Sequence, residues 1–580
     1  MRNAKHLQQF CNRVRGASWL YANHVTAAGV PRSGAAVIEE LIIKKSLECR
    51  PDTWYLGSIE VVELRNGLYW FSGNGTVRNY STKDVAAGDK PAPTSLRRLA
   101  QFTIIYGVSE LANNALAFLL VPVYTRLLSP SQYGILEVFN RTLEVLSIFA
   151  GVGIGMAALR SYFGKEEGEG GEAVFSTAMI FALGNSFWIA VVLALAAGEM
   201  SQRLLGTRAY APLFRLTFCI LIFDQGFGLV RTYLKAIGRP IAFSVLSVSK
   251  YAVTLGLIIA SLLYLGREVK FVLLATLAAN VLYFIPSGIA MLSRIGARVS
   301  WPTLKRMVVF GFPFVPGGVL LFILNSSDRF FLIAMAGQNE AGLYALGYRI
   351  ALVPVMLLLV PFQAAWGPFM MEKGETPEGP RLFARVLSYL TAAYCALSLL
   401  LALFAKEAIQ VMAAPSFAAS YRIIPVVLLA YAFWVIAIVL DAGIYITRKT
   451  GYKPLLLAAG AGTNIGLNLL LIPRFGMMGA AYATAVGFLV FVILTYVVSM
   501  RLYPVPYEFG KMLICVCGAV ALFCISSLIR LGGTPGVLSR VGFVACYAGV
   551  LRLAGFTMRA ELELVKDWKD RWVRSRGGNG

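Results

Sequence analysis

The chain has 580 residues, of which 58% are hydrophobic and only 14% are charged. Soluble chains are about 45–50% apolar and about 25% charged, so no water-soluble fold could bury this surplus. With a net charge of +23 and a mean hydropathy of +0.68, the chain is expected to be a membrane protein with Lys and Arg between apolar segments, not a nucleic-acid-binding protein.

Catalytic and metal-binding side chains are scarce in the apolar part of the chain. The two histidines, His6 and His24, both precede it, which excludes histidine acid–base catalysis, proton relays and histidine metal sites from the membrane region. Six of the eight cysteines lie in apolar runs, where a thiol behaves as a small hydrophobic group. We therefore expect no enzyme activity, no cofactor and no metal site.

Residues 1–95 differ from everything after them, because they are polar, of mixed charge and without a long apolar run. Two interpretations stay open for this extension. The segment around Trp54 to Tyr80 is one candidate for a small strand-rich unit. Alternatively the extension is disordered or is not part of the functional unit. In the second case the start codon was assigned too far upstream, and Val85 or a nearby codon is the true beginning. Mass spectrometry that finds native peptides from before residue 85 would contradict the second interpretation.

From Leu99 onward, apolar runs follow one another, each long enough to cross about 30 Å of hydrocarbon. Backbone polar groups in lipid must be paired within their own segment, so each run is expected to be a helix. The loops are short and leave no room for a catalytic domain. The fourteen expected spans cover residues 101–124, 135–158, 175–197, 212–230, 241–264, 270–292, 308–335, 342–366, 384–404, 423–446, 454–473, 478–499, 511–529 and 539–557.

Positively charged residues are unevenly distributed between the expected loops. Lys and Arg are concentrated in one of the two alternating sets of loops and in the basic tail 561–580, and few lie in the other set. Loops rich in Lys and Arg stay in the cytoplasm. Both termini are therefore expected to face the cytoplasm, as an even number of spans requires.

A repeat relates the two halves of the apolar region. The motifs YG at 106–107 and YGI at 133–135 open the first two spans, and FG at 310–311 and AGLY at 341–344 open the seventh and eighth, about 205 residues later. Six spans per half preserve orientation, so we predict two parallel bundles around a central cavity, an arrangement suited to alternating access. The expected domains are the extension 1–95, bundles at 97–300 and 301–502, two further helices at 503–560 and the tail 561–580.

Several motifs resemble those of bacterial polysaccharide-export flippases, over about residues 97–560. These motifs are LLVPVYTRLLSPSQYG at 119–134, NSSDR at 325–329, AGLY at 341–344, FQAAWGPF at 362–369, NIGLN at 464–468, IP at 472–473, GAAYAT at 479–484 and YPVPYE at 503–508. The family is identified as part of the superfamily that also holds multidrug and toxin extrusion exporters and the lipid II flippase. The first 95 residues lie outside the resemblance.

The resemblance implies an all-α, multi-pass protein of the inner membrane, with two six-helix bundles and two C-terminal helices. The implied substrate is an undecaprenyl-pyrophosphate-linked oligosaccharide repeat unit, flipped from the cytoplasmic to the outer leaflet for O-antigen, capsule or exopolysaccharide synthesis. Membrane lipid is a further partner, and a polysaccharide polymerase and a chain-length regulator are candidate protein partners. No cofactor or reaction chemistry is implied. The sequence does not indicate whether H+ or Na+ is the counterion.

A cavity for a pyrophosphate needs cations, because an unpaired dianion in hydrocarbon is very costly, and the arginine fork suits phosphate oxygens. Glu137, Arg141 and Glu144 lie at i, i+4 and i+7 of the second span and share one helix face. This pattern places Arg141 on the cavity wall or, alternatively, forms a self-neutralising stripe against other helices.

The seventh span carries a second polar face, with Asn325, Asp328 and Arg329 at helical spacing. Arg329 is a candidate phosphate ligand. Asp328 is a candidate ion-pair partner of Arg349 in the next span, and Arg349 is also counted among the cavity cations. An ion pair between helices without a substrate role is the alternative for these residues.

Two further residues inside the membrane, Lys250 and Glu110, are candidates to bind substrate or a coupling ion. Lys250 lies in the middle of the fifth span with no acidic neighbour nearby in the sequence, and an unpaired lysine there costs about 2.5–3.5 kcal/mol on insertion scales, which predicts a water-filled cavity. Glu110 forms a polar face with Asn113 and Asn114. Glu110 and Asp328 are candidates to bind a coupling cation, and helix–helix hydrogen bonding is the alternative.

Other functions fit the composition less well. A multidrug exporter of the same superfamily usually has about twelve spans and an acidic cavity, whereas this sequence predicts two more spans and places Arg and Lys within the membrane. A polysaccharide polymerase needs a long external loop or an acidic catalytic motif, and the external loops here are short. A channel would need a ring of like polar groups, which one asymmetric chain hardly supplies.

Overall fold

The computed structural model describes three short strands between residues 60 and 80, and then residues 93–164, 171–529 and 533–556. The chain separates into two compact units, Met1–Arg98 and Leu99–Gly580. Questions about the start codon and the basic tail lie outside the described residues.

The first unit contains an antiparallel sheet of strands β1 (Glu60–Leu64), β2 (Gly67–Phe71) and β3 (Val77–Tyr80), in the order β1-β2-β3. The strands fall within the segment for which the sequence left a strand-rich unit open. The domain assignment of the extension stays a prediction.

The membrane part of the second unit is helical, since every regular element described between residues 99 and 556 is a helix. The first helices are α4 (Pro93–Leu127), α5 (Pro130–Gly151), α6 (Ile154–Phe163), α7 (Gly171–Leu205), the short 3₁₀ helix η1 (Arg208–Tyr210), α8 (Ala211–Ala236), α9 (Pro240–Tyr264) and α10 (Val269–Ile295). The all-α fold predicted for the membrane region is confirmed.

The second half begins with three short helices where the sequence predicted one span at 308–335. Its helices are α11 (Trp301–Gly311), α12 (Phe314–Ser326), α13 (Asp328–Met335), α14 (Gln338–Ala351), the π-helix η2 (Val355–Leu359), α15 (Val360–Gly374), α16 (Gly379–Leu403), α17 (Ala405–Met412), the 3₁₀ helix η3 (Pro415–Ile423), α18 (Ile424–Leu440), α19 (Ala442–Ile446), α20 (Tyr452–Phe475) and α21 (Met477–Leu502). Two further helices follow, α22 (Phe509–Leu528) and α23 (Gly533–Leu553).

The number of membrane spans agrees with the sequence. Among the described residues, thirteen helices are long and apolar enough to cross a membrane, and a fourteenth span results if α11 and α12, bent by 41°, are taken together. Pro313 lies at this break, where proline removes a backbone N–H from the helix and bends it. The eighth span runs from Gln338 to Gly374, longer than the predicted 342–366.

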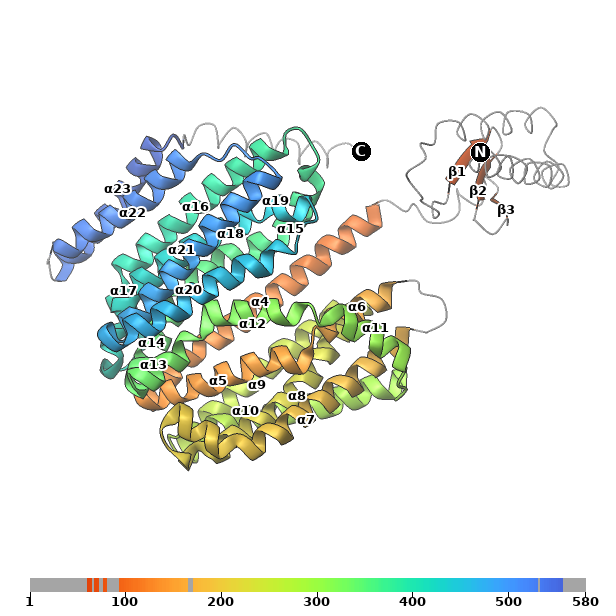
Figure 1. Ribbon diagram of the computed structural model, residues 1–580, viewed down its shortest axis with the longest axis horizontal. Helices are drawn as coiled ribbons and strands as arrows, with labels where there is room; N and C mark the ends of the chain where they lie inside the picture. Colours follow the sequence, from red (N-terminus) through yellow and green to blue (C-terminus); the bar gives the residue numbers. More distant parts are fainter. Residues whose placement is uncertain are drawn as a thin grey trace, which may run out of the picture. The chain divides into compact units, whose positions relative to one another are not determined.

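The helices form two groups with α4 between them (Figure 1). Helices α7, α8, α9 and α10 pack on one another, and α16, α18, α20 and α21 form the other group, on which α22 and α23 pack. Helix α11 packs on α6 and α7 of the first group, whereas α12 packs on α20 of the second. The bent seventh span therefore passes from one group to the other, and the domain boundary at residue 301 stays a prediction.

The motif SPSQ at residues 129–132 caps the N-terminus of helix α5. The Ser129 hydroxyl accepts a hydrogen bond from the Gln132 backbone N–H (3.3 Å), and the Gln132 side-chain oxygen accepts one from the Ser129 N–H (3.1 Å). This reciprocal cap satisfies two helix-terminal donors, and Pro130 occupies a position that needs none.

Helix α5 approaches helices α14 and α11 very closely, and glycines permit both contacts. A Cβ atom on Gly342 of α14 would lie 1.9 Å from the Pro130 carbonyl oxygen, and one on Gly134 would lie 2.1 Å from the Gln338 oxygen. A Cβ on Gly311 of α11 would lie 2.1 Å from the Val152 oxygen. Three of the four glycines in the sequence repeat, Gly134, Gly311 and Gly342, are thus points where backbones touch, whereas a Cβ on Gly107 would meet nothing within 4 Å.

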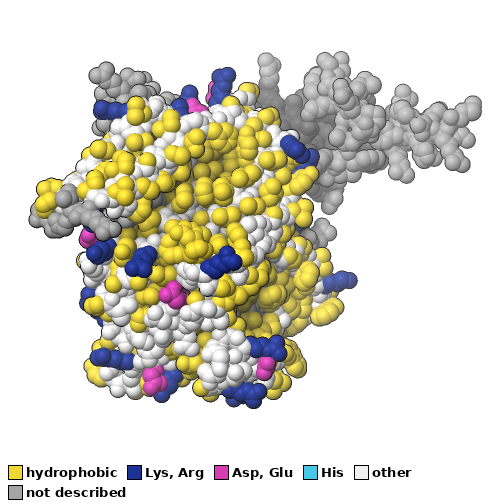
Figure 2. Space-filling view, turned by 60° about the vertical axis from the view of Figure 1, so that its left-hand side comes forward, with side chains coloured by type: hydrophobic (Ala, Val, Ile, Leu, Met, Phe, Trp, Pro, Cys, Tyr) yellow, Lys and Arg dark blue, Asp and Glu magenta, His cyan; other side chains and the backbone are white. Residues whose placement is uncertain are grey.

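The outer surface of the helical body suits a lipid environment. Figure 2 shows hydrophobic side chains in a broad continuous area over the upper half of the visible face, whereas the charged side chains lie around it. Long apolar side chains are exposed on the helical body, Leu195 at 85% and Leu538 at 67% among them. Such a surface is stable only against hydrocarbon, and the protein is a multi-pass membrane protein.

Candidate functional site

A large polar cavity lies where the two helix groups face each other. It has a volume of about 890 Å³ and is lined by side chains from α4, α5, α9, α10, α12, α13, α14, η2 and α18. Five acidic or basic side chains line it, namely Glu137, Arg141, Glu144, Arg329 and Arg349. Three of the four cations named from the sequence therefore converge on one cavity.

Arg141 is held by both acidic residues of its own helix. Its Nε lies 2.7 Å from Glu137 Oε1, and its Nη1 contacts a Glu144 oxygen. Nη1 also donates to the Ser326 hydroxyl of α12 at 3.3 Å. Both interpretations of this stripe are therefore partly right, because Arg141 lies on the cavity wall and is neutralised there.

Arg329 and Asp328 form a buried pair beside the cavity. The guanidinium Nη1 lies 2.5 Å from Asp328 Oδ1 and donates to the Asn325 carbonyl at 2.7 Å. The Arg329 guanidinium carbon lies 3.9 Å from the centre of the Tyr348 ring, a cation–π contact. Since the two charged residues are only 1–2% exposed, this arginine is less free to bind a substrate than its position suggests.

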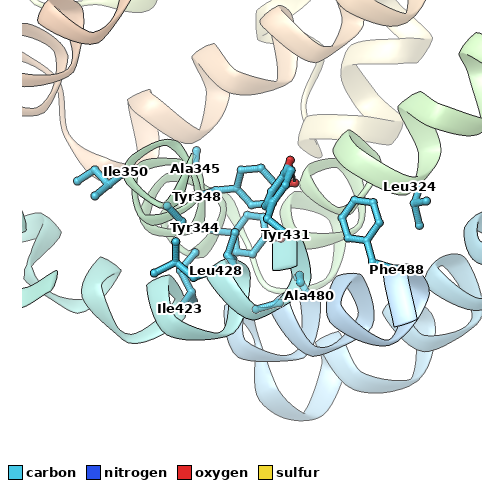
Figure 3. Packing of buried hydrophobic residues seen from close by; sticks show 14 of the residues in the cluster. Leu324, Tyr344, Ala345, Tyr348, Ile350, Ile423, Leu428, Tyr431, Ala480 and Phe488 are labelled. Atoms are coloured by element: carbon cyan, nitrogen blue, oxygen red, sulfur yellow. Dashed lines mark hydrogen bonds between the residues drawn. The ribbon is translucent and has the colours of Figure 1, made fainter. Parts of the chain in front are cut away.

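Three tyrosines, Tyr344, Tyr348 and Tyr431, contact this pair and its neighbour Asn325. Figure 3 shows the three rings close together. The Tyr344 hydroxyl donates a hydrogen bond to Asp328 Oδ2, and the hydroxyl oxygens of Tyr348 and Tyr431 lie 2.8 Å apart. Tyr431 also donates to the Asn325 side-chain oxygen at 3.2 Å. Sequence reasoning missed the role of these tyrosines, although the i, i+4 spacing of Tyr344 and Tyr348 places them on one helix face.

Arg349 lies on the cavity wall without a carboxylate partner among the described side chains. Its Nη2 donates to the Ala117 carbonyl of α4 at 2.8 Å. The predicted ion pair between Asp328 and Arg349 is wrong, because the Asp328 oxygens are taken by Arg329, Tyr344 and the Thr484 hydroxyl (3.3 Å). Arg349 is thus the cavity cation best placed to bind an anion.

Lys250 lies outside the cavity lining and is paired, contrary to the expectation of an isolated lysine. Its Nζ lies 3.2 Å from Asp224 Oδ1 of α8 and 4.3 Å from the centre of the Phe227 ring. Asp224 is 26 residues away in the sequence, so no spacing rule within one helix could find this partner. The argument from an unpaired lysine to a cavity therefore fails, and a substrate role for Lys250 stays a prediction.

Glu110 also lies outside the cavity lining and forms an ion pair with Arg231 of α8, at 3.1 Å between carboxylate oxygen and Nη2. Its side chain is 42% exposed. A coupling-ion role for Glu110 stays a prediction. In the described part of the chain, no three His, Cys, Asp or Glu residues come together in a way that would hold a metal ion.

The charges around the cavity nearly balance. Arg141, Arg329 and Arg349 are offset by Glu137 and Glu144 on the wall and by Asp328 behind Arg329. The cavity therefore has one cation without a carboxylate and a second, Arg141, whose partner Glu144 is 43% exposed. An incoming anion could bind Arg349 and compete with Glu144 for Arg141, without the cost of unpairing the buried Arg329.

Comparison with known proteins bears on this arrangement. Residues 99–373 match the family of polysaccharide biosynthesis proteins. Over 293 residues the chain is 25% identical to the succinoglycan biosynthesis transport protein ExoT of Rhizobium meliloti (strain 1021), and this alignment covers 49% of the chain and 57% of that relative. The chain thus aligns with little more than half of the length of its curated relative.

Solved structures of similar fold are known for this chain. It is similar to the lipid II flippase MurJ in an inward closed conformation, with a TM-score of 0.62, 14% identity, and coverage of 77% of this chain and 98% of MurJ. It is also similar to an inward-facing multidrug resistance transporter of the MATE family in the MOP superfamily, with a TM-score of 0.50, 17% identity, and coverage of 69% and 94%. The predicted all-α fold with many membrane helices is confirmed.

Proposed function

We propose that the protein flips undecaprenyl-pyrophosphate-linked oligosaccharide repeat units from the cytoplasmic to the outer leaflet of the inner membrane, for the synthesis of a surface polysaccharide. The observation that carries this proposal is Arg349, a cation without a carboxylate partner in the described residues, on the wall of a cavity between two helix groups. The match of residues 99–373 to the family of polysaccharide biosynthesis proteins supports it.

In this proposal the pyrophosphate binds Arg349 first and then shares Arg141 with Glu144. Guanidinium groups bond phosphate oxygens in pairs, and the Tyr124 and Asn140 side chains on the same wall can add neutral donors. The prenyl chain stays in the lipid while the charged head group and sugars occupy the cavity. No covalent bond forms or breaks, so the protein acts as a transporter and not as an enzyme.

The cycle we propose is alternating access between the two helix groups. The bent seventh span connects the groups, and the glycine contact of α5 with α14 is a close approach that the cycle would have to keep or open. Both termini face the cytoplasm in this proposal, as the distribution of Lys and Arg indicates. A polymerase and a chain-length regulator are the enzymes that would receive the product, and H+ or Na+ is the counterion if the cycle is coupled.

The test is a gene deletion followed by a determination of which leaflet holds the lipid-linked glycan. Vesicles of known orientation are treated with a glycosidase that cannot cross the membrane. Complete undecaprenyl-linked repeat units trapped on the cytoplasmic side, with loss of surface polymer, are expected. If no units accumulate and efflux of cationic drugs changes instead, the protein is a multidrug exporter. Units that cross but stay unpolymerised would indicate a polymerase.

A matched pair of variants tests the site. Arg349→Gln removes the cation that has no carboxylate partner, and hydrogen bonds to charged groups contribute about 1.5–3 kcal/mol, so export should fall about tenfold or more. Arg203→Gln is the control, because Arg203 forms an ion pair with Glu199 that is largely exposed on α7. Normal export in Arg349→Gln at normal membrane level would remove this residue from the site.

A further inference from the structure

A second cavity of about 440 Å³ lies inside the second helix group, between α15, α18, α20 and α21. It is separate from the cavity between the groups, but α18 supplies a wall to both, since Tyr431 lines the first and Trp434, one helical turn further on, lines the second. A volume of this size is typical of sites for small organic molecules. Nothing in the transport site described above uses it.

Aromatic side chains, Trp366, Trp434, Tyr445 and Phe491, form part of the wall of this cavity. The Trp434 ring is stacked on Phe491 with centroids 5.8 Å apart and planes at 26°, and Trp366 is stacked on Phe362 at 5.4 Å and 20°. These stacks fix the planes of both indoles. An aromatic face carries partial negative charge and attracts the weakly positive C–H face of a sugar ring.

The polar part of the wall is an ion pair with an incomplete set of hydrogen bonds. Asp441 is 5% exposed, and its Oδ2 accepts from Lys453 Nζ at 2.7 Å, while Nζ also donates to the Tyr445 hydroxyl at 2.9 Å. The other carboxylate oxygen, Oδ1, is shielded and has no donor among the described residues. A buried acceptor without a donor is costly, and rotation of the carboxylate, a soft torsion, would present it to a hydroxyl group in the cavity.

The aromatic rings and the Asp441–Lys453 ion pair together favour one class of ligand over others. A metal or organic cation would be repelled by Lys453, and a phosphate would be repelled by Asp441. A prenyl chain would leave the ion pair and Gln363 without polar contacts. A neutral molecule with hydroxyl groups at its edge and C–H groups on its faces satisfies both the indoles and the Asp441–Lys453 pair, and a pyranose ring has this chemistry.

We propose that this cavity is a saccharide subsite, which binds a sugar ring of the lipid-linked oligosaccharide while Arg349 and Arg141 bind its pyrophosphate. The inference rests on the proposed function, because it names where the glycan of the same substrate lies. Trp434 stacks on the ring, and Asp441 and Lys453 bond its hydroxyl groups. The affinity of the protein for the glycan is then separable from its affinity for the lipid pyrophosphate.

The experiment compares two probes on the full-length protein in nanodiscs. One is undecaprenyl pyrophosphate without sugar, and the other is the lipid-linked oligosaccharide extracted from cells that lack the gene. We expect the second to bind the wild-type protein about tenfold more tightly. Trp434→Ala and the charge-neutral pair Asp441→Asn with Lys453→Met should each remove this difference while leaving the affinity for undecaprenyl pyrophosphate unchanged. Trp188→Phe is the control, because Trp188 is 67% exposed on α7.

The outcomes separate the inference from the function on which it rests. Arg349→Gln should weaken the binding of both probes by the same factor. If the two probes bind the wild-type protein equally, or if Trp434→Ala keeps the full difference, the saccharide subsite is wrong while the flippase proposal stands. If neither probe binds the wild-type protein, the proposed function itself fails. A Trp434→Ala variant that binds neither probe would mean that Trp434 supports the fold. The conservative Trp434→Phe variant keeps a ring for stacking. If the subsite exists, this variant must retain part of the difference in affinity between the two probes.

Discussion

At the scale of single residues, two arginines on the cavity wall, Arg141 and Arg349, differ in their partners. Arg141 lies between two carboxylates of its own helix, whereas Arg349 donates to the carbonyl of Ala117 and forms no close ion pair with a described carboxylate. A carboxylate next to an arginine competes with any anionic ligand for the same N–H groups. The partners, and not the arginines alone, therefore determine how tightly a pyrophosphate binds.

This competition predicts that Glu144→Gln binds undecaprenyl pyrophosphate more tightly than the wild-type protein does. The Arg141–Glu144 pair is partly exposed, and such pairs contribute about 1 kcal/mol or less, so the gain should be about two- to fivefold. Titration of the purified protein with undecaprenyl pyrophosphate measures it. Glu199→Gln, which removes an exposed carboxylate from Arg203, should have no effect. Weaker binding in Glu144→Gln would show that this carboxylate supports the site instead of competing.

At the scale of elements, the repeat motifs indicated that certain glycines matter but not why. The Gly311 and Gly342 positions were visible in the sequence, and helical spacing predicted the stripe around Arg141. The spacing rule works within one helix, where i and i+4 are neighbours by geometry. The Lys250–Asp224 pair joins two helices, and which carboxylate a lysine meets across helices depends on packing that a single sequence does not reveal.

The contact of α5 with α14 predicts that Gly342→Ala separates these two helices. An added methyl group would overlap the Pro130 carbonyl, and overpacking of this kind costs about 1–3 kcal/mol. In a cysteine-free background, Ala341→Cys, buried in the wild-type protein, should react faster with a maleimide when Gly342→Ala is present. Gly462→Ala on α20, with open space around it, is the control. Equal labelling rates in both backgrounds would mean that the contact adapts without opening.

A different element contact, that of α22 with α16, depends on Glu508. Its carboxylate accepts from Lys511 Nζ at 2.8 Å and from the Ser388 hydroxyl of α16 at 3.0 Å. The hydrogen bond from Lys511, followed by that from Ser388, holds the pKa of Glu508 below its usual value. A depressed carboxylate pKa stabilises the fold above the unfolded value of about 4.3, and this stabilisation is lost as the pH falls through the folded value.

Glu508→Gln should therefore lower the thermal midpoint at pH 7 but leave it nearly unchanged once the pH has fallen below the lowered pKa of the folded carboxylate, where the wild-type side chain is itself protonated. Thermal unfolding of both proteins in detergent, at a series of pH values, measures this difference. Glu372→Gln is the control, because the Glu372 side chain is 69% exposed and contacts only its neighbour Lys373 among the described residues. A constant difference across the pH range would contradict an ionic role for Glu508.

At the scale of the whole molecule, hydropathy was sufficient for the architecture. Span number follows from the length of apolar runs, because lipid forces each run to satisfy its own backbone. The bend between α11 and α12 was missed, although Pro313 marks it, since an apolar run looks continuous whether or not its helix is straight. The convergence of Arg141, Arg329 and Arg349 was expected only as a list of cations. Their unequal pairing arises from contacts between α4, α5, α13 and α14 that no periodicity encodes.

The near balance of charge around the cavity predicts how the membrane potential acts on the transport cycle. Three arginines face three carboxylates, so the empty protein moves little net charge, whereas the loaded protein moves the charge of the pyrophosphate. With the cytoplasm negative, moving an anion outward releases about 2.3 kcal/mol per elementary charge per 100 mV.

In proteoliposomes with a potassium gradient and valinomycin, flipping of undecaprenyl-pyrophosphate glycan away from the negative side should accelerate as the gradient is raised, and reversing the gradient should slow it. Neutralising Asp328 together with Arg329 keeps the balance and should keep the voltage dependence, whereas Glu144→Gln adds a positive charge and should reduce it. A flipping rate that responds to a pH or sodium gradient but not to voltage would mean that a counterion neutralises the moving charge, and the potential would then not be the driving force.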